Sequence, residues 1–181
     1  ATTGALRWAW DVKRIDRPGA QLRPGEIWPQ GTPNVWNVIS ADEQMGLIFL
    51  GTGNAGNDHS GGRRDPAADR FSSAVVAVEI DSGATRWAFR TVINDRFDYD
   101  VGAQPVVTNI TIGGVRRRVV IQGTKTGSLF VLDAASGRPL RPVAQVPVPR
   151  GGVRGERLSP TQPQSVFYPN FAGTPGRNPE R

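Results

Sequence analysis

The sequence predicts an all-β protein built from repeated units of strand, tight turn and strand. Of its 181 residues, 22 are glycine and 15 are proline, about one residue in five, which suits many short strands joined by turns. No segment shows a sustained apolar period of 3.6 residues, so long amphipathic helices are not expected. A motif that recurs along the chain is the third observation, and it indicates the blades of a β-propeller.

The recurring motif is a glycine that follows a short polar turn. Its copies are "TGALRWAW" (3–10), "VVAVEIDSGATRWAFRT" (75–91) and "LFVLDAASGRPLRPV" (129–143). In the first two copies a tryptophan, Trp8 or Trp87, stands four residues after the glycine, whereas the third copy has Arg141 there. The glycines are 79 and 54 residues apart, so one interval carries an insertion. We expect these tryptophans to dock one blade against the next.

The strands expected between the copies are rich in Val, Ile, Phe and Thr and are bounded by Gly, Asp and Asn. They cover residues 45–54, 72–80, 104–112, 117–124 and 127–134. Residues 11–31 and 55–71 are polar and rich in Gly, Pro and Arg, which predicts two long loop insertions. Residues 142–181 have a similar composition and predict an extended segment without clear strands. The whole chain, 1–181, is therefore interpreted as part of a single domain.

The composition excludes several kinds of site. No cysteine is present and His59 is the only histidine, so zinc, copper, haem attachment, iron–sulfur and thiol chemistry are not expected. Any metal would be a hard cation held by oxygen atoms, such as calcium or magnesium. The net charge of +6 gathers in loops and in one strand pattern rather than in one stripe with exposed aromatics, so nucleic-acid binding is not expected.

Residues 94–105, "NDRFDYDVGAQP", crowd three aspartates and two aromatic residues into one short stretch. Carboxylates this close repel each other, so at least one needs a cation, a metal or a proton as partner. If the stretch is extended, Asp98 and Asp100 share one face and the aromatic side chains share the other. The residues alone leave open whether these aspartates are catalytic or cap turns.

Several longer stretches follow one another in an order that points to a known family. They are "GTPNVWNVISADEQMGLIFLGTGN", "RFSSAVVAVEIDSGATRWAFRTV", "FDYDVGAQP", "GTKTGSLFVLDAASGRPL" and "LSPTQPQS". This order resembles the quinoprotein dehydrogenases, eight-bladed propellers that bind pyrroloquinoline quinone (PQQ), and especially their membrane-bound glucose and quinate/shikimate branch. The resemblance runs from residue 1 to about residue 168. Because a whole propeller of this family is several times longer, it implies a fragment of about three blades.

The resemblance implies roles for four residues. Trp36, 18 residues before Asn54, matches the tryptophan that stacks under the quinone ring, and Asn54 matches a metal-ligating asparagine. Lys125 matches the cation that hydrogen-bonds the quinone oxygens. Asp98, which follows an aromatic residue 27 positions before that lysine, matches the catalytic base and also lies at the metal. The alternatives are a blade-docking tryptophan, an asparagine in a left-handed turn, an exposed turn lysine and a turn-capping aspartate.

The activity implied by the resemblance is oxidation of a sugar or polyol hydroxyl, of the glucose, quinate or shikimate type. Asp98 would take the hydroxyl proton while hydride moves to the C5 carbonyl of PQQ, which calcium or magnesium polarises. Electrons would pass to ubiquinone in the membrane, on the periplasmic side of the bacterial inner membrane. Residues 93–97, Ile-Asn-Asp-Arg-Phe, replace the His-His-Asp-Leu-Trp common in the glucose branch, so this stretch leaves open whether glucose, quinate or shikimate is the substrate.

A non-catalytic propeller scaffold with PQQ-like repeats is the alternative function. Such a scaffold would share the blade repeat with the dehydrogenases. It would have no reason to keep Trp36, Asp98 and Lys125 in matched order, so these three residues distinguish the two hypotheses.

Overall fold

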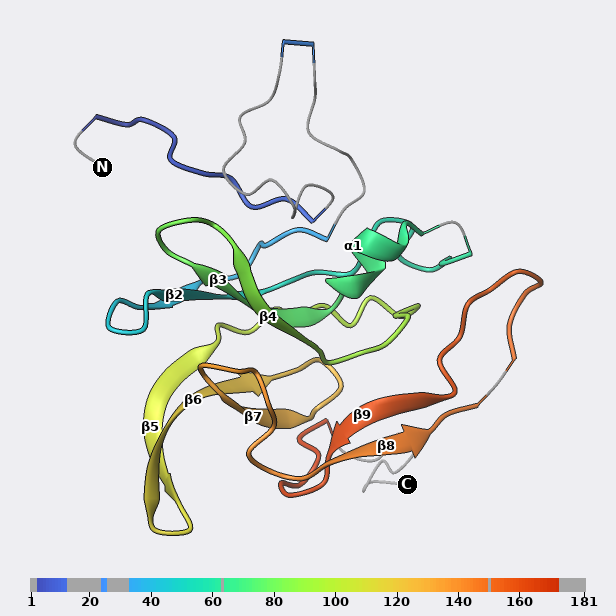
Figure 1. The fold of residues 1–181 in the computed structure, drawn as a ribbon. Helices are drawn as coiled ribbons and strands as arrows, with labels where there is room; N and C mark the ends of the chain where they lie inside the picture. Colours follow the sequence, from blue (N-terminus) through green and yellow to red (C-terminus); the bar gives the residue numbers. More distant parts are fainter. Residues whose placement is uncertain (1–2, 13–23, 26–32, 63, 150, 173–181) are drawn as a thin grey trace.

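Nine strands in three separate antiparallel sheets make up most of the part of the chain that the structure describes (Figure 1). The structure is a computed structural model, and it describes residues 3–12, 24–25, 33–62, 64–149 and 151–172. The predicted loop insertion at 11–31 lies almost wholly outside the described residues. The all-β prediction is confirmed, because in the described part far more residues lie in strands than in the single short helix.

The first sheet is a four-stranded meander in which each strand pairs with the next one along the chain. Its strands are β1 (Ser40–Asp42), β2 (Leu47–Gly51), β3 (Ala74–Glu79) and β4 (Thr85–Arg90). Almost every residue of β3 is buried, because its alternating side chains enter two different apolar cores. Valine and alanine suit a strand that is covered on both faces.

The second sheet is a three-stranded meander, and the third is a single hairpin. Their strands are β5 (Val106–Ile112), β6 (Val115–Gly123), β7 (Leu129–Asp133), β8 (Val143–Pro147) and β9 (Thr161–Ser165). The prediction that residues 142–181 lack clear strands is therefore wrong at β8 and β9. Pro147 and Pro163 made these strands hard to predict, because proline argues against a central strand. Both strands of an isolated hairpin are edge strands, and edge strands tolerate proline.

The segment 55–71, predicted as a long loop, contains the short helix α1 (Pro66–Arg70). The Asp65 side chain caps it by accepting a hydrogen bond from the N–H of Ala67 at 2.9 Å. Pro66 begins the helix, at a position where a missing N–H costs nothing. The loop prediction is wrong for these residues. No helix in the described ranges is long and apolar enough to cross a membrane.

Two apolar cores lie on the two faces of the first sheet. The core shared with the second sheet contains Leu47, Phe49, Val75, Ala77, Trp87, Val101, Val120, Phe130, Leu132 and Ala134. The core on the other face contains Val12, Leu50, Ala55, Ala68, Phe71, Ala74, Val76 and Val78, with Trp8 and Trp10 packed against it. The N-terminal segment and α1 therefore cover the face of the first sheet that the second sheet leaves open.

The repeated tryptophans dock each unit of the repeat against the next, as predicted. Each indole N–H donates to the carbonyl three residues before the next repeat's glycine, and each ring covers that glycine. The contacts are Trp8 to Ile80 (2.7 Å) and Gly83, and Trp87 to Ala134 (3.0 Å) and Gly137. Both glycines have positive φ, and a Cβ on either would lie within 2.7 Å of the indole, so only glycine fits.

Candidate functional site

The turn after β2, with the sequence Gly-Thr-Gly-Asn, is held between two other segments of the chain. The N–H of Gly53 donates to the carbonyl of Asn34 at 2.8 Å. On the other side, the N–H of Val101 donates to the carbonyl of Thr52 at 3.1 Å. A Cβ on Gly53 would lie 2.5 Å from the Asn34 side-chain oxygen, so any larger residue here would displace that side chain. The turn thereby joins the segment around Trp36 to the aspartate-rich segment.

Trp36 leaves much of its indole open, with 54% of the residue exposed. One edge of the ring lies against Gly102, where a Cβ would come within 2.7 Å of the indole. Asn37 fixes the segment by donating from its side-chain amide to the carbonyls of Val101 and Ala103, at 2.9 and 3.1 Å. Trp36 takes no part in the tryptophan–glycine docking described above. An open aromatic face held in place is suited to stacking on a planar ring.

The aspartate-rich loop owes its shape to Asp95, which is 1% exposed. Its carboxylate accepts hydrogen bonds from the N–H of Phe97 (2.9 Å) and from the N–H of Tyr99 (2.7 Å). The hydroxyl of Ser73 donates a third, at 2.6 Å. The turn-capping role left open by the sequence therefore applies to Asp95, whose carboxylate is committed to the loop.

Asp98 lies at the tip of this loop, and its side chain is 45% exposed. Its φ of 59° is in the left-handed region, which aspartate tolerates better than most residues. The condition of an extended stretch, on which the shared face of Asp98 and Asp100 depended, is therefore not met at this residue. Phe97 and Tyr99 still contact each other, with ring centroids 5.9 Å apart, because the turn returns both rings to one side.

Lys125 contacts Asp98 and Asp100 and lies near the ring of Trp36. Its Nζ donates to the backbone carbonyl of Asp98 and to Oδ2 of Asp100, both at 2.9 Å, and lies 3.5 Å from Oδ2 of Asp98. The same Nζ lies 5.9 Å from the centroid of the Trp36 ring. Burial lowers the pKa of Lys125, but the hydrogen bond and charge of Asp100, and then those of Asp98, raise it overall. Lys125 is thus a cation that offsets the crowded negative charge.

Asp100 has a positioning role that the sequence did not reveal. Its Oδ1 accepts the backbone N–H of Asn54 at 2.5 Å, while its Oδ2 accepts from Lys125. One carboxylate therefore ties the Gly-Thr-Gly-Asn turn to the turn that carries the lysine. The alternation of Asp98 and Asp100 was visible in the sequence, but only these contacts separate their roles.

Asn54 is 6% exposed and does not have positive φ, so the left-handed-turn alternative does not describe it. Its Nδ2 donates to the carbonyl of Asp58 at 3.0 Å, and its Oδ1 accepts from the hydroxyl of Ser72 at 3.0 Å. A carbonyl oxygen has two lone pairs, so Oδ1 can accept one further partner. The two hydrogen bonds of the Asn54 amide therefore do not use up the accepting capacity of Oδ1.

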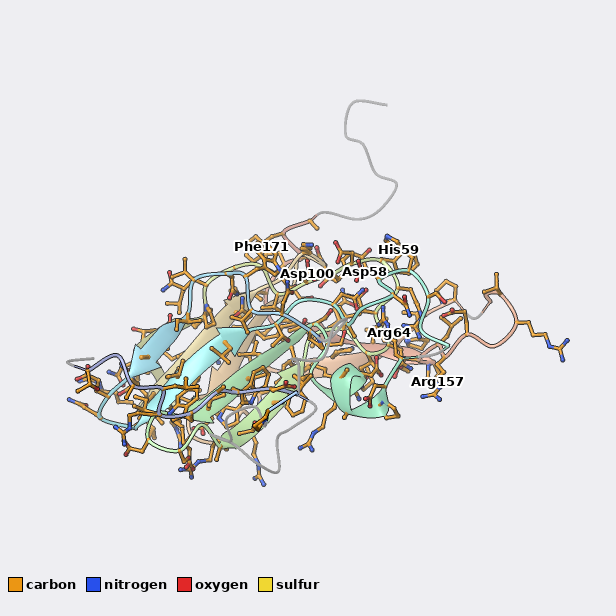
Figure 2. The ribbon with its side chains drawn as sticks, turned by 90° about the horizontal axis from the view of Figure 1, so that it is seen from above. Asp58, His59, Arg64, Asp100, Arg157 and Phe171 are labelled. Carbon is orange, nitrogen blue, oxygen red and sulfur yellow. The ribbon has the colours of Figure 1, made fainter. Side chains whose placement is uncertain are left out.

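Trp36, Asn54 and Asp98 line a common cavity of about 250 Å³. The remaining lining residues are Asn34, Gly56, Asp58 and Asp100. Figure 2 shows Asp58 and Asp100 at the same edge of the molecule. A larger cavity of about 570 Å³ lies between the aspartate-rich loop and the third sheet, but none of Trp36, Asn54 and Asp98 lines it.

The donors of the smaller cavity suit a hard cation, because amide and carboxylate oxygens are the ligands that calcium and magnesium prefer. Within the described ranges, no group of three or more His, Cys, Asp and Glu side chains is arranged to hold a metal. Calcium takes six to eight oxygen ligands. Asn54 and Asp98 supply oxygen donors of the right chemical type, but two residues are too few to complete such a site. The open indole beside Lys125 fits a planar, anionic quinone.

Sequence comparison gives the family. The model of the β-propeller domain of PQQ glucose/ethanol/alcohol dehydrogenases matches residues 1–178. Quinate/shikimate dehydrogenase (quinone) of Acinetobacter baylyi is 38% identical over 170 residues, which are 93% of this chain and 21% of that protein. The glycerol dehydrogenase large subunit of Gluconobacter oxydans is 39% identical over 173 residues, with 93% and 23% covered. Quinoprotein glucose dehydrogenase of Escherichia coli is 35% identical over 163 residues, with 90% and 20% covered.

A solved structure supports the same assignment. Quinohemoprotein alcohol dehydrogenase from Comamonas testosteroni matches with a TM-score of 0.56 at 25% identity, over 76% of this chain and 20% of that one. The chain spans about a fifth of the length of the curated relatives named above (21, 23 and 20%). From the family match, the tryptophan docking and the three sheets, we conclude that the chain belongs to the PQQ glucose/ethanol/alcohol dehydrogenase family and forms part of its β-propeller domain.

Proposed function

We propose that the protein to which this chain belongs oxidises a hydroxyl group of a sugar or polyol with PQQ as its cofactor. The observation that carries the proposal is that Lys125 contacts both Asp98 and Trp36, although the three residues come from separate segments of the chain. Family membership alone would support the fold. The contacts among these three side chains support the chemistry.

Asp98 is the proposed base. Its carboxylate is open to a ligand, and the ammonium of Lys125 lies 3.5 Å away. A nearby cation favours the ionised form that can accept a proton from a hydroxyl group. When bound, PQQ supplies the electrophilic carbonyl that accepts hydride, and a calcium or magnesium ion supplies Lewis acidity.

Trp36 and Lys125 are the proposed cofactor-binding residues, and Asn54 and Asp98 the proposed metal ligands. The indole of Trp36 offers an open face, and Lys125 can donate to the quinone oxygens with a proton that is not engaged by Asp98 or Asp100. Asp100 holds Lys125 and the backbone of Asn54 in place. Loss of Asp100 would therefore disturb both groups at once.

The proposed substrates are polyhydroxylated small molecules, because the relatives named above are quinate/shikimate, glycerol and glucose dehydrogenases. The name of the relative from Acinetobacter baylyi specifies a quinone, which supports a quinone as the electron acceptor, and membrane ubiquinone is the quinone that we propose. The proposed location is the periplasmic side of the bacterial inner membrane. A non-catalytic scaffold is less well supported, because it gives no reason for Lys125 to contact Asp98 and face Trp36.

Turnover of the complete protein tests the proposal. The protein is reconstituted with PQQ and either calcium or magnesium, and glucose, quinate, shikimate and glycerol are each offered with an electron-accepting dye. We expect dye reduction with at least one of them, and only when PQQ and the metal are both present. Tight PQQ binding without oxidation of any of these alcohols would contradict the proposed function.

A further inference from the structure

We propose that the third sheet, together with the connection between its two strands, positions the catalytic loop through the ion pair between Arg96 and Glu156. The catalytic loop is here residues 94–100, with Asp98 at its tip. The inference rests on the proposed function, because it takes Asp98 as the base. It assigns Arg96, Glu156 and Gln162 as positioning residues that act through the loop backbone.

Arg96 lies two residues before Asp98, and its side chain is only 8% exposed. Its Nε donates to Oε2 of Glu156 at 2.6 Å, and its Nη2 donates to the carbonyl of Arg157 at 2.5 Å. Its Nη1 donates back to the carbonyl of Asp95 at 2.8 Å. One guanidinium therefore joins the catalytic loop to the connection between β8 and β9, whose Arg157 lies beside α1 in Figure 2.

The carboxylate of Glu156 also accepts hydrogen bonds from a third segment of the chain, at Ser60 and Gly61. The N–H of Gly61 and the hydroxyl of Ser60 each donate to Oε1 of Glu156 at 3.2 Å. A Cβ on Gly61 would overlap the guanidinium of Arg96, so the arginine packs directly on this glycine. The hydrogen bond from Arg96 lowers the pKa of Glu156, in keeping with an ionised partner.

A second contact holds the chain just before the loop. Gln162 of β9 pairs with the backbone of Ile93: its Oε1 accepts from the N–H and its Nε2 donates to the carbonyl, both at 2.7 Å. The side-chain amide thus satisfies both backbone groups of one residue. Gln162 belongs to the Ser-Pro-Thr-Gln-Pro stretch (159–163), part of the last segment on which the family resemblance rests.

The contacts of Arg96 and Ile93 with the β8–β9 hairpin fix the position of the catalytic loop, whereas the hydrogen bonds of Asp95 within the loop fix its conformation. Asp95 closes the turn internally, but Arg96 and Ile93 attach the turn to the third sheet. Asp98 itself is half exposed, so the position of its carboxylate depends on where the loop is held. A base displaced by about 1 Å can lose on the order of 100-fold in rate.

The test uses the complete protein with PQQ and metal bound, and compares Arg96→Leu and Glu156→Gln with Arg154→Gln. Arg154 is exposed in the same connection, so its variant is the matched control for lost charge. We expect kcat to fall about 10- to 100-fold in each pair variant, while KM and bound PQQ change less than about threefold. The double variant should be no worse than Arg96→Leu alone, because that single variant already removes the ion pair. Unchanged kcat in both pair variants would overturn the proposal.

Hydrogen–deuterium exchange gives a readout that does not depend on turnover. In either pair variant, amides of residues 94–101 should exchange faster, while those of the β5–β6 hairpin should not change. Unchanged exchange in the loop overturns the proposal even if kcat falls. Glu156→Gln keeps the shape of the side chain and serves if Arg96→Leu does not fold. If the parent protein binds PQQ but oxidises no alcohol, the proposed function fails, and exchange alone decides whether the third sheet holds the loop.

Discussion

Replacement of Gly137 by alanine tests the docking between repeat units. The φ of Gly137 is +70°, and a Cβ there would lie 2.6 Å from Cδ2 and Cε3 of Trp87. Gly46 is the matched control, because it has a similar φ of +64° but a Cβ there would meet no atom within 4 Å. The two variants therefore share the backbone penalty and differ in the contact with the indole.

The magnitude follows from these two contributions. The left-handed conformation costs alanine about 1–2 kcal/mol at either site. Crowding against the ring of Trp87, whose N–H is held by Ala134, adds about 1–3 kcal/mol at Gly137 alone. Gly137→Ala should therefore lower the free energy of unfolding by about 2–5 kcal/mol, and Gly46→Ala by about 1–2 kcal/mol.

Urea unfolding of the complete protein, followed by fluorescence, measures both costs from the midpoint shifts. A further comparison uses the Trp87→Leu background, in which the smaller side chain leaves room for a methyl group. There the cost of Gly137→Ala should approach that of Gly46→Ala. Equal costs for the two variants in the parent protein would refute the docking argument.

Three further predictions concern the cofactor, acid stability and the isolated chain. Trp36→Ala should weaken PQQ binding by about 1 kcal/mol or more, whereas Trp87→Ala should instead lower stability by about 3–5 kcal/mol; a PQQ titration of Trp36→Ala that gives the parent affinity would remove the stacking role. Burial opposes ionisation of Asp42, but hydrogen bonds from Arg118 at 2.6 Å and from the N–H of Met45 lower its pKa below the ordinary value overall. The ionised Asp42 therefore stabilises the fold above the ordinary pKa of aspartate, and this stabilisation is lost as the pH falls through the lowered pKa. Asp42→Asn should therefore lower the urea midpoint at pH 7, with the difference shrinking in acid; a difference independent of pH would exclude this ion pair as its source. The isolated chain should associate in gel filtration, because its sheets leave open edges, and a monomer with one sharp unfolding transition would argue against a propeller fragment.

The repeat allowed the sequence to predict that Trp8 and Trp87 dock one blade against the next, whereas the contact of each indole with the glycine of the next repeat was found only in the structure. The strands rich in Val and Ile were equally visible. β8 and β9 were not, since Pro147 and Pro163 count against a strand unless its position at an edge is known. Helix α1 was missed because a single capped turn has no measurable period.

The candidate site was predictable in its members and less so in its contacts. Trp36, Asn54, Asp98 and Lys125 could be named because their order and spacing match a family pattern, and the structure brings them to one place. The attachment of Arg96 to Glu156 could not be named. These residues are 60 positions apart, in two irregular segments, and nothing local in either segment indicates the other.

The measurement that tests the central claim most directly is the rate at which bound PQQ is reduced in Asp98→Asn. The complete variant protein is loaded with PQQ and metal and mixed with an alcohol that the parent protein oxidises, and cofactor absorbance is followed through a single turnover. Trp36 and Lys125 remain, so we expect the variant to bind PQQ but to reduce it more slowly by several orders of magnitude, because the proton acceptor is lost. Reduction at nearly the parent rate would contradict the assignment of Asp98 as the base and the site built around it.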